Sequence, residues 1–472
     1  MHKLLVAASL MAVMLAGCAD ESGDANSDDP DKLVQDLGPI VLEESIVDVP
    51  QIAQLHDPYE PTMEVCDDGN IYVTGHTFLV DTTGAPVFGS DNDGESWFQL
   101  PWFQDQTLPA GIPGSTPPVS DEIFLACGDD GWLYGGDITL ASYPVNAWSD
   151  HGTMHEYWNF NAYNELDNVQ QAGECSTVGV VPVPAPAKDR PWTAYNNGTL
   201  LVTSNPAGGA NQIGAVSVPF ASPAPVSYGT VIDGIDWNLC AGPGGSIPGV
   251  PDINSQGMFA APQKSGGSLW LTLGHASNVM DVRNVELFPS ASGGEITSHY
   301  GHATFDIDDT LYVGITTNYE NAAGNRTGRM TFAVSMDDGE TFQNASFETG
   351  EGNLRHFYMD ANRFGEGSLV VWAKDGETTN ADGNVIAYDW YMGHLHADET
   401  GTPYLKNVFQ VIDEGTLPSA HVTGAAVGPD GRAYTAMYDR ATTQLSVFIQ
   451  RDGPTLPVAS MTVAAVSETM AE

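Results

Sequence analysis

Short apolar runs that alternate with polar residues recur along most of this chain, and a turn signal precedes each run. The clearest example is CDDGNIYVTG, beginning at Cys66. Six further segments share its form: CGDDGWLYGG at Cys127, YNNGTLLVTS at Tyr195, KSGGSLWLTL at Lys264, DIDDTLYVGI at Asp306, RFGEGSLVVW at Arg363 and VGPDGRAYTA at Val427. Gly, Asp and Asn suit such turns because they tolerate a positive φ angle. Strand-like runs precede the turns: TMEV, EIFLA, PWTA, GMFAA, HATFDI, HFYMDA and TGAAV. The pattern predicts a strand, a tight turn and a second strand, seven times.

The spacing of these units leaves room for two further strands in each. A seven-fold array of four-stranded sheets is most economically a β-propeller, which leaves only short and protected sheet edges. The chain also has 51 Gly and 30 Pro, which favours turns over long helices. The predicted fold class is therefore all-β, a β-propeller of four-stranded blades. Seven blades fit best, six or eight stay open, and a pair of β-sandwiches or a β-solenoid is the alternative architecture.

The ends of the chain differ from this repeat. MHKLLVAASLMAVMLAGC has a basic start, an apolar run too short to span a membrane, and an ending that resembles a bacterial lipobox. We therefore expect a lipoprotein signal peptide over 1–18, with Cys18 lipidated, and an acidic tether over 19–37. The propeller is predicted over 38–456 and a flexible tail over 457–472. The protein is expected at the cell envelope, on the outer membrane or cell surface, with the lipid anchor as its only membrane contact.

Acidic residues dominate the charge of the chain. There are 61 Asp and Glu against 15 Lys and Arg, so the formal net charge is −46 and the pI is near 4.1. Such a surface repels phosphate backbones, which excludes nucleic acid as a partner. Attraction of cations or basic partners is one interpretation of this acidity, and solubility in a salty or extracellular setting is the other.

Four cysteines remain after Cys18: Cys66, Cys127, Cys175 and Cys240. Their even number and the exported context predict two disulfides, for which three pairings are open. None of the four forms a close Cys-x-x-Cys pair, so a zinc site is not predicted.

The segment SMDDGETF, from Ser335 to Phe342, follows the third strand-like run of its unit, and SDNDGESW, from Ser90 to Trp97, has the same place in the first unit. Both segments resemble the Asp-box, or BNR repeat, of the sialidase-like β-propellers, S-x-D-x-G-x-T-W/F. The matching positions are Ser335, Asp337, Gly339, Thr341 and Phe342, and Ser90, Asn92, Gly94, Ser96 and Trp97. Asn92 departs from the aspartate of the motif. The resemblance implies a sialidase-like propeller.

Physical chemistry assigns these segments a structural role. Asp337 is expected to accept backbone N–H bonds, Gly339 to supply the left-handed conformation, and Phe342 to pack between blades. The spacing lacks the later bidentate glutamate of a calcium loop. No cofactor or metal site is predicted, although a structural calcium ion stays open, and His394 and His396 would lie on one face of a strand as a metal clip.

Strand alternation predicts where a ligand would bind. All the first turns and both Asp-box segments should share one face, so the starts of first strands and the ends of second strands should form the opposite mouth, where we expect the site. The predicted ligand-binding residues there are His76, Arg190, His275, His299, His302, Arg355, His356, His421 and Arg440. Further polar residues expected at the same mouth are Asp137, Asp189 and Lys374.

The leading functional hypothesis is a monomeric, lipid-anchored propeller that binds a glycan or a surface protein at this mouth. The alternative is a glycoside hydrolase, an exo-sialidase-like or another retaining enzyme, at the same place. Its candidate catalytic residues are Glu60, Asp121, Glu122 and Tyr438. The resemblance implies an arginine triad, a tyrosine nucleophile assisted by a glutamate, and an aspartate acid/base. The early Phe-Arg-Ile-Pro motif that usually supplies the first arginine is absent from the sequence.

Overall fold

The described part of the chain is built entirely from β-strands. The structure is a computed structural model, and it describes residues 40–48, 59–76, 86–101, 123–137, 142–149, 154–161, 188–189, 192–206, 212–218, 236–238, 241–242, 247–289, 295–296, 300–320, 324–381, 385, 387–415, 424–439 and 444–459. Within those ranges there is no helix with the length and apolarity needed to cross a membrane.

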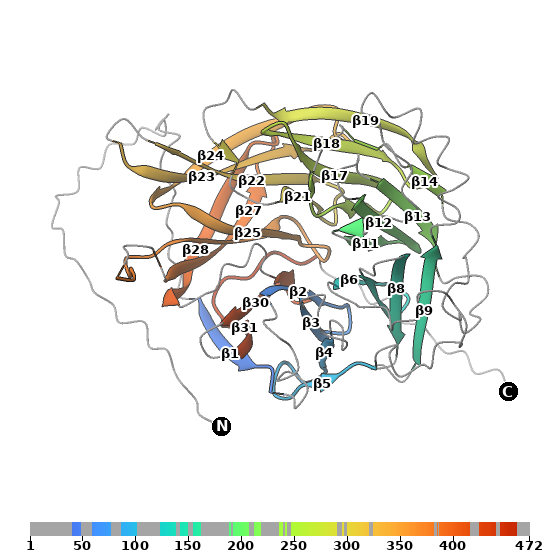
Figure 1. Ribbon diagram of the computed structural model, residues 1–472, viewed down its shortest axis with the longest axis horizontal. Helices are drawn as coiled ribbons and strands as arrows, with labels where there is room; N and C mark the ends of the chain where they lie inside the picture. The colour runs from blue at the N-terminus through green and yellow to red at the C-terminus, as the bar shows by residue number, and fades with distance from the viewer. Residues whose placement is uncertain are drawn as a thin grey trace.

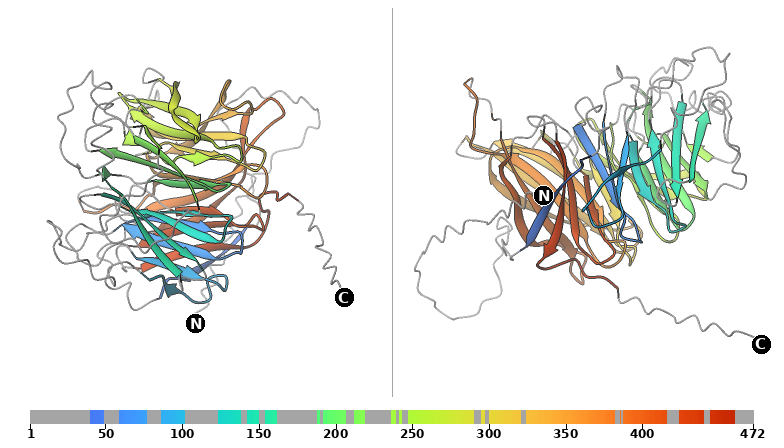
Figure 2. Two further views of the ribbon diagram at one scale, coloured as in Figure 1. Left: turned by 90° about the vertical axis from the view of Figure 1, so that its right-hand side faces the viewer. Right: turned by 90° about the horizontal axis from the view of Figure 1, so that it is seen from below.

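Seven antiparallel sheets surround a central axis (Figure 1), which confirms the predicted seven-bladed propeller. Seen edge-on, the strands run between the two faces of the ring (Figure 2). Blade 1 contains β2 (Tyr59–Val65), β3 (Ile71–His76), β4 (Val87–Ser90) and β5 (Phe98–Gln99). Blade 2 contains β6 (Ile123–Cys127), β7 (Trp132–Asp137), β8 (Ser142–Ser149) and β9 (Met154–Asn161).

In the next three blades, two short segments pair with the second strand at the inner edge of the sheet. Blade 3 contains β10 (Lys188–Asp189), β11 (Thr193–Asn196), β12 (Thr199–Pro206), β13 (Gln212–Ser217) and β14 (Asp236–Asn238). Blade 4 contains β15 (Ile247–Pro248), β16 (Asp252–Ile253), β17 (Met258–Ser265), β18 (Ser268–His275) and β19 (Asn278–Phe288). Blade 5 contains β20 (Glu295–Ile296), β21 (His302–Phe305), β22 (Leu311–Glu320), β23 (Arg326–Ser335) and β24 (Gln343–Glu351).

The last two blades bring the chain back to its start. Blade 6 contains β25 (Leu354–Ala361), β26 (Ser368–Asp375), β27 (Tyr388–Ala397) and β28 (Pro403–Gly415). Blade 7 contains β29 (Gly424–Val427), β30 (Ala433–Asp439), β31 (Gln444–Asp452) and, at its outer edge, β1 (Val41–Ile46) from the beginning of the described chain. The antiparallel pairing of β1 with β31 closes the ring.

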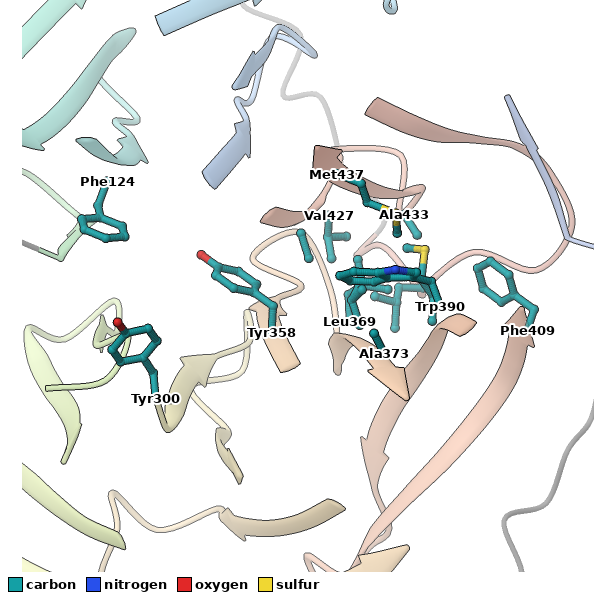
Figure 3. Packing of buried hydrophobic residues seen from close by; sticks show 14 of the residues in the cluster. Phe124, Tyr300, Tyr358, Leu369, Ala373, Trp390, Phe409, Val427, Ala433 and Met437 are labelled. Carbon is teal, nitrogen blue, oxygen red and sulfur yellow. The ribbon is translucent and has the colours of Figure 1, made fainter. Parts of the chain in front are cut away.

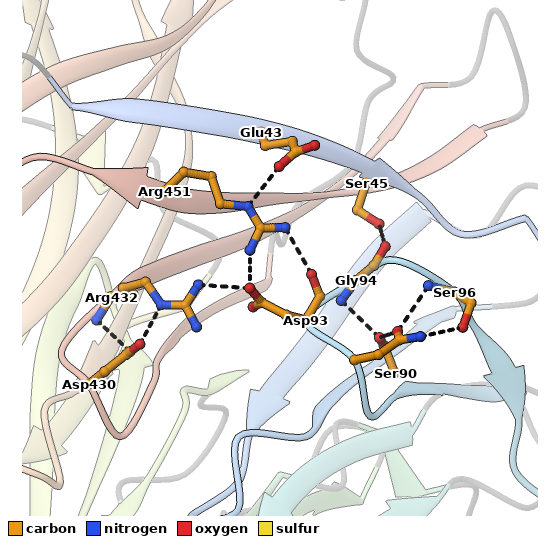
Figure 4. A network of polar contacts seen from close by, with 10 residues as sticks. Glu43, Ser45, Ser90, Asp93, Gly94, Ser96, Asp430, Arg432 and Arg451 are labelled. Atoms are coloured by element: carbon orange, nitrogen blue, oxygen red, sulfur yellow. Dashed lines mark hydrogen bonds and ion pairs between the residues drawn. The ribbon is translucent and has the colours of Figure 1, made fainter. Parts of the chain in front are cut away.

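A charged network reinforces this closure. Arg432, from the first turn of blade 7, and Arg451, from β31, both bind Asp93 of blade 1 (Figure 4). Arg451 also binds Glu43 of β1, with 2.8 Å between Nε and Oε2. Because Arg432 lies in a first turn and Asp93 in a turn between third and fourth strands, the contact shows that these two kinds of turn share one face, as the strand alternation predicts. We call it the turn face.

The Ser335–Phe342 segment forms the hydrogen-bonded turn that its residue types predict. Asp337 accepts bonds from Thr341 N (2.8 Å) and Thr341 Oγ1 (2.6 Å), and Gly339 has a φ angle of 76°. Asn92 takes the place of the aspartate in blade 1 and accepts a bond from Ser96 N (3.0 Å). Phe342 packs against the hydrophobic cluster between blades 4 and 5.

The prediction for the fourth unit is wrong by one strand. Met258–Ser265 and Ser268–His275 were expected as first and second strands, but they are the second and third strands of blade 4. The first strand, Asp252–Ile253, has only two residues, too few to show alternation. The two-residue turn at Gly266 and Gly267 has the same positive φ angles as a first turn, which makes the two kinds of turn indistinguishable in the sequence.

Hydrophobic clusters fill the seams between neighbouring blades, and one of them extends to the centre of the ring. Figure 3 shows Phe124, Tyr300 and Tyr358, from blades 2, 5 and 6, pointing into the same central space. A disulfide joins Cys66 to Cys127 across blades 1 and 2, with 5.3 Å between their Cα atoms. Cys175 and Cys240 lie outside the described residues, so the second predicted disulfide stays a prediction.

Candidate functional site

A cavity of about 420 Å³ opens in the central channel on the turn face. The first strands and the first turns of the blades form its walls. These turns begin at equivalent residues, each marked by the backbone bond or register pair that closes the turn: Cys66, Gly128, Asn196, Asn254, Asp306, Asn362 and Gly428. Counting from this residue shows that the cavity is built from two repeated positions of the blade.

The deeper position lies two residues before the turn, and it is occupied by Glu64, Ala126, Ala194, Asp252, Thr304, Asp360 and Ala426. All of these except Ala426 line the cavity. The shallower position directly follows the turn-start residue, and it is occupied by Asp67, Asp129, Asn197, Ser255, Ile307, Arg363 and Pro429, which all line the cavity. Because the pleat of a strand repeats every two residues, the deeper position is directed to the channel in six of the seven blades, whatever residue occupies it.

Two of the deep acids tie neighbouring blades together. Asp252 Oδ2 accepts a bond from Phe305 N of the next blade (2.7 Å), and Asp360 Oδ2 accepts the equivalent bond from Val427 N (2.9 Å). Burial raises the pKa of Asp252 to about 7 and that of Asp360 to about 6, although these backbone bonds favour the ionised forms.

Glu64 has one more methylene group than these aspartates, and it binds Arg363 instead of a backbone amide. Arg363 NH2 lies 2.8 Å from Glu64 Oε2, and NH1 donates to Cys127 O (3.2 Å). Since blade 7 lies between blade 6 and blade 1, the Arg363 side chain reaches past its neighbouring blade to blades 1 and 2. Burial raises the pKa of Glu64 to about 8 against the attraction of Arg363, and the charges of Asp360 and Asp252 add to the rise.

Aromatic side chains form the inner end of the cavity. Phe124, Trp192 and Tyr358 line it, and the Phe124 and Trp192 ring centroids are 3.7 Å apart. Trp192 is only 1% exposed, and its Nε1 has no hydrogen-bond partner within the described part of the chain. At the outer end Val458 and Ala459 line the cavity, and Ala459 N donates to Phe364 O (2.7 Å). The predicted tail, 457–472, lies outside the described residues from 460 on.

The cavity is strongly acidic. Among the described residues that line it, Arg363 is the only basic one, and seven are acidic: Glu64, Asp67, Asp129, Asp252, Asp306, Asp309 and Asp360. Such a lining can accept hydrogen bonds from hydroxyl or ammonium groups, whereas it opposes an anion. In the described part of the chain, no three His, Cys, Asp or Glu side chains are arranged to hold a metal ion.

Many residues predicted for the opposite mouth cannot be placed. Asp121, Glu122, Arg190, His299, His421 and Arg440 lie outside the described residues. Glu60, His76, Asp137 and Asp189 fall within strands, but their side chains are not described. The backbone geometry of that mouth agrees with the expectation, because the start of β2 pairs with the end of β3, Tyr59 with His76. The ligand site predicted there stays a prediction.

Several other predicted residues lie in the interior. Tyr438 is 2% exposed in the cluster between blades 7 and 1. His302 is buried against the rings of Phe357 and Tyr358, and burial lowers its pKa to about 3, so it is neutral at physiological pH. His356 is buried and stacks on Trp390, with 5.2 Å between centroids. These positions are typical of packing histidines and tyrosines rather than of groups that face solvent.

The remaining predicted residues have local partners. Arg355 binds Asp375 through Nε (2.6 Å) and NH2 (3.2 Å), and Lys374 lies 5.5 Å from the centre of the Tyr391 ring. His275 ends the third strand of blade 4, so it lies on the turn face and not at the opposite mouth as predicted. The strand shift in the fourth unit is the reason. His394 and His396 have ring centroids 6.5 Å apart.

The sequence interpretation missed the cavity residues Glu64, Asp252, Asp360 and Arg363. A signal for the three acids was present, because each stands two residues before a turn start, in EVCDDG, DINSQG and DANRFG. Aligning the units on their turns instead of on their strands would have placed these acids in one ring.

A scan against protein-family models finds no match, and a search of curated proteins finds none either. Solved structures do resemble the chain. The endosialidase of phage phi92 shares 13% identity over 89% of this chain and 70% of its own, with a TM-score of 0.43. The BP39L lectin from Burkholderia pseudomallei shares 12% over 85% and 98%, with a TM-score of 0.46. The WD40 domain of SCAP from fission yeast shares 8% over 87% and 98%, with a TM-score of 0.39. The propeller assignment rests on the strand pairing of this chain rather than on these likenesses.

Proposed function

We propose that this chain is a carbohydrate-binding propeller whose ligand occupies the turn-face cavity of the central channel. The observation that carries the proposal is the combination of carboxyl groups and an aromatic inner wall in one cavity. A sugar hydroxyl both donates and accepts hydrogen bonds, so it can donate to Glu64 or Asp360. The apolar face of a sugar ring can pack on an aromatic side chain.

The charge of the cavity narrows the class of sugar. A sialic acid carries a carboxylate, which needs guanidinium groups that are available for pairing. Arg363 is the only basic side chain among the described lining residues, and it already binds Glu64 and Cys127 O. The proposal is therefore for a neutral sugar in this cavity. A glycan on a surface protein would satisfy it equally well.

The proposal also places a monomeric protein at the cell envelope, anchored through a lipid on Cys18. The lipobox-like MHKLLVAASLMAVMLAGC supports it, and so does the Cys66–Cys127 disulfide, since disulfides persist in oxidising compartments. In a bacterial host, radiolabelled palmitate should enter the wild-type protein and not a Cys18→Ala variant. Absence of label from the wild type would reject the anchor.

The binding test starts with an array of neutral and sialylated glycans, followed by calorimetric titration of the best ligand. Glu64→Gln should weaken binding about tenfold or more, because a sugar hydroxyl then loses its hydrogen bond to the Glu64 carboxyl group at the cavity wall. Glu95→Gln, on an exposed turn outside the cavity, is the matched control and should bind as the wild type does. Binding confined to sialylated glycans, or equal affinity of both variants, would contradict the proposal.

A glycoside hydrolase is the second candidate, and one observation favours it. Glu64 and Asp360 line the same cavity, and burial raises the pKa of Glu64, to about 8, further than that of Asp360, to about 6. Two carboxyl groups held in different protonation states can serve as acid and as base or nucleophile. A screen of neutral fluorogenic glycosides should then show turnover that Glu64→Gln reduces by at least a hundredfold. If the wild type binds a glycoside without hydrolysing it, the hydrolase candidate is rejected and the carbohydrate-binding function remains.

A further inference from the structure

A second hollow, of about 270 Å³, lies on the turn face at the seam between blades 3 and 4. We call it the seam groove. Blade 3 contributes Asn197, Thr199 and Ser217 to its lining, and blade 4 contributes Gln256, His275 and Ser277. Among the described residues that line it, none is an acid, a lysine or an arginine. In a protein of net charge −46 this makes it chemically unlike the acidic cavity beside it.

The seam groove adjoins the channel cavity. Asn196, Asn197 and Ser255 line both hollows. Asn197 and Ser255 hold the shallow position of blades 3 and 4, and Asn197 Nδ2 donates to Ser255 O (3.2 Å). This pair forms the boundary between the two hollows, a sill that a chain-like ligand would cross from the cavity into the groove.

The polar groups of the seam groove are arranged to receive hydroxyl groups. One N–H of each amide is already bound: Asn196 Nδ2 donates to Ile253 O (3.0 Å), and Gln256 Nε2 donates to Asp309 Oδ2 (3.2 Å). The amide groups of Asn196, Asn197 and Gln256 each have a second N–H donor and an oxygen acceptor, and the hydroxyls of Thr199 and Ser217 beside them are donors or acceptors.

The ends of the groove are held rigidly and carry little charge. Asp309, which lines the channel cavity, accepts three bonds from blade 4, including Ser255 N (3.1 Å) and Ser255 Oγ (2.9 Å). His275 is held by Ser277 Oγ (Nδ1, 2.7 Å) and by Gln256 O (Nε2, 2.8 Å). A preformed, uncharged polar surface of this kind loses little entropy on binding a neutral polyol.

We infer that the seam groove is a second sugar subsite, so that the ligand is a neutral oligosaccharide with one unit in the channel cavity and the next in the groove. The inference rests on the proposed carbohydrate-binding function. It assigns to Thr199 and Ser217, which are register partners on β12 and β13, the contacts that recognise the second unit.

Calorimetric titration with three ladders of β-1,4-linked glucose, N-acetylglucosamine and xylose, each of one to four units, tests this inference. In at least one ladder, affinity should rise tenfold or more from one unit to two. The Thr199→Val/Ser217→Ala variant should lose most of that gain and keep the affinity for one unit. The matched control is Thr331→Val/Ser346→Ala, a hydroxyl pair with the same register relation on β23 and β24 of blade 5, which should keep the gain.

The outcomes separate the two proposals. Affinity that does not change with ligand length, or a gain in affinity that survives in Thr199→Val/Ser217→Ala, would reject the second subsite. Sugar binding in the channel cavity would still stand. If no ladder binds to the wild type at all, the proposed function itself fails for neutral sugars. Thermal unfolding of both double variants checks that each remains folded.

Discussion

Arg363 supplies the positive charge that faces the carboxyl groups of the channel cavity. It is 32% exposed at the side chain, and its partner Glu64 is 14% exposed. Glu64 is also close enough to Asp360 and Asp252 for their charges to raise its pKa. One guanidinium thus offsets the repulsion among three carboxyl groups that belong to different blades. The loss of unfolding free energy on removing this guanidinium should depend on whether the three carboxyl groups are ionised.

Arg363→Met should lower the free energy of unfolding by about 1–3 kcal/mol at pH 8 and by less at pH 5. At pH 8 the three carboxyl groups lose their counter-charge, whereas at pH 5 they are protonated in the folded state and need none. Urea denaturation at both pH values measures the difference. Arg329→Met is the matched control, because its ion pair with Glu348 has nearly the same side-chain exposure, 32% and 15%. Equal pH dependence of the two variants would refute the channel argument.

Asp337 shows how a residue can look catalytic in a sequence and be structural in the fold. Within the described part of the chain, its carboxylate accepts hydrogen bonds only from its own turn: from Ser335 Oγ (2.8 Å), Thr341 N and Thr341 Oγ1. Those bonds lower its pKa. Asp337→Ala should reduce the free energy of unfolding by about 1–2 kcal/mol without changing ligand affinity.

Urea denaturation and glycan titration of the same samples check that prediction. Asn92→Asp, at the equivalent place in blade 1, makes a useful comparison. An aspartate there can accept the bond from Ser96 N that Asn92 Oδ1 accepts, so stability should change by less than about 0.5 kcal/mol. A loss of affinity in Asp337→Ala at full stability would show that the turn has a functional role.

At the scale of elements, the first turns do two jobs. They join the first and second strands, and their exposed ends form the rim of the cavity. The disulfide between Cys66 and Cys127 joins two of these turn regions directly. It therefore holds blade 1 against blade 2 beside the position where Arg363 contacts Cys127 O.

A Cys66→Ala/Cys127→Ala variant should lose about 2–4 kcal/mol of unfolding free energy, because the disulfide closes a loop with a sequence separation of 61 residues. Urea denaturation of the variant and of the wild type measures this loss without a reductant, which would also act on any disulfide between Cys175 and Cys240. A stability equal to that of the wild type would mean that this crosslink does not constrain the unfolded chain.

At the scale of the whole molecule, acidity affects stability in two ways. A net charge of −46 produces general repulsion over the surface, which salt screens. The channel acids add a second effect that salt screens much less. Because their folded-state pKa values are raised, these acids bind more protons in the folded than in the unfolded chain between about pH 4 and pH 8. Burial lowers the pKa of His302, His394 and His396, so these side chains bind fewer protons in the folded chain below about pH 6.5 and oppose the acids there. Stability should therefore fall as pH rises from about 6.5 to 8, where the acids alone dominate.

In 0.5 M NaCl, the melting temperature of the wild type should still fall between pH 6.5 and pH 8. Glu64→Gln should show a smaller fall, since its amide does not titrate. Differential scanning calorimetry at several pH values measures both slopes, with Glu95→Gln as the control that keeps the wild-type slope. A slope that disappears in salt would mean that surface repulsion alone causes the pH dependence.

Much of the architecture was predictable because turns and strands are local. A turn such as CDDG needs positive φ at its glycine, and an alternating run such as NIYV forms a strand with one buried face. Seven copies of this pair predict seven blades. Blade 4 was the exception, since its first strand of two residues has no periodicity and a Gly-Gly turn later in the blade has the same chemistry as a first turn.

The candidate site was predictable only in part. Strand alternation correctly placed six of the seven first turns and the Ser90–Trp97 and Ser335–Phe342 segments on one face, and it failed in the fourth unit, where the predicted first turn joins the second and third strands. It did not reveal that the turn face has a cavity of its own, because a cavity depends on what fills the axis of the ring. Residues such as Glu64 and Asp360 look like ordinary strand acids until seven first strands are brought round the same axis.

The sequence by itself determined the repeated strand and turn units, the acidity of the chain and the hydrogen-bonded turn at Ser335–Phe342, since each depends on neighbouring residues or on composition. Only the tertiary structure decided that Arg363 pairs with Glu64, 299 positions away, and that Asn197 meets Ser255 at a sill between two hollows. Such contacts depend on ring closure, which brings together residues that no local pattern relates.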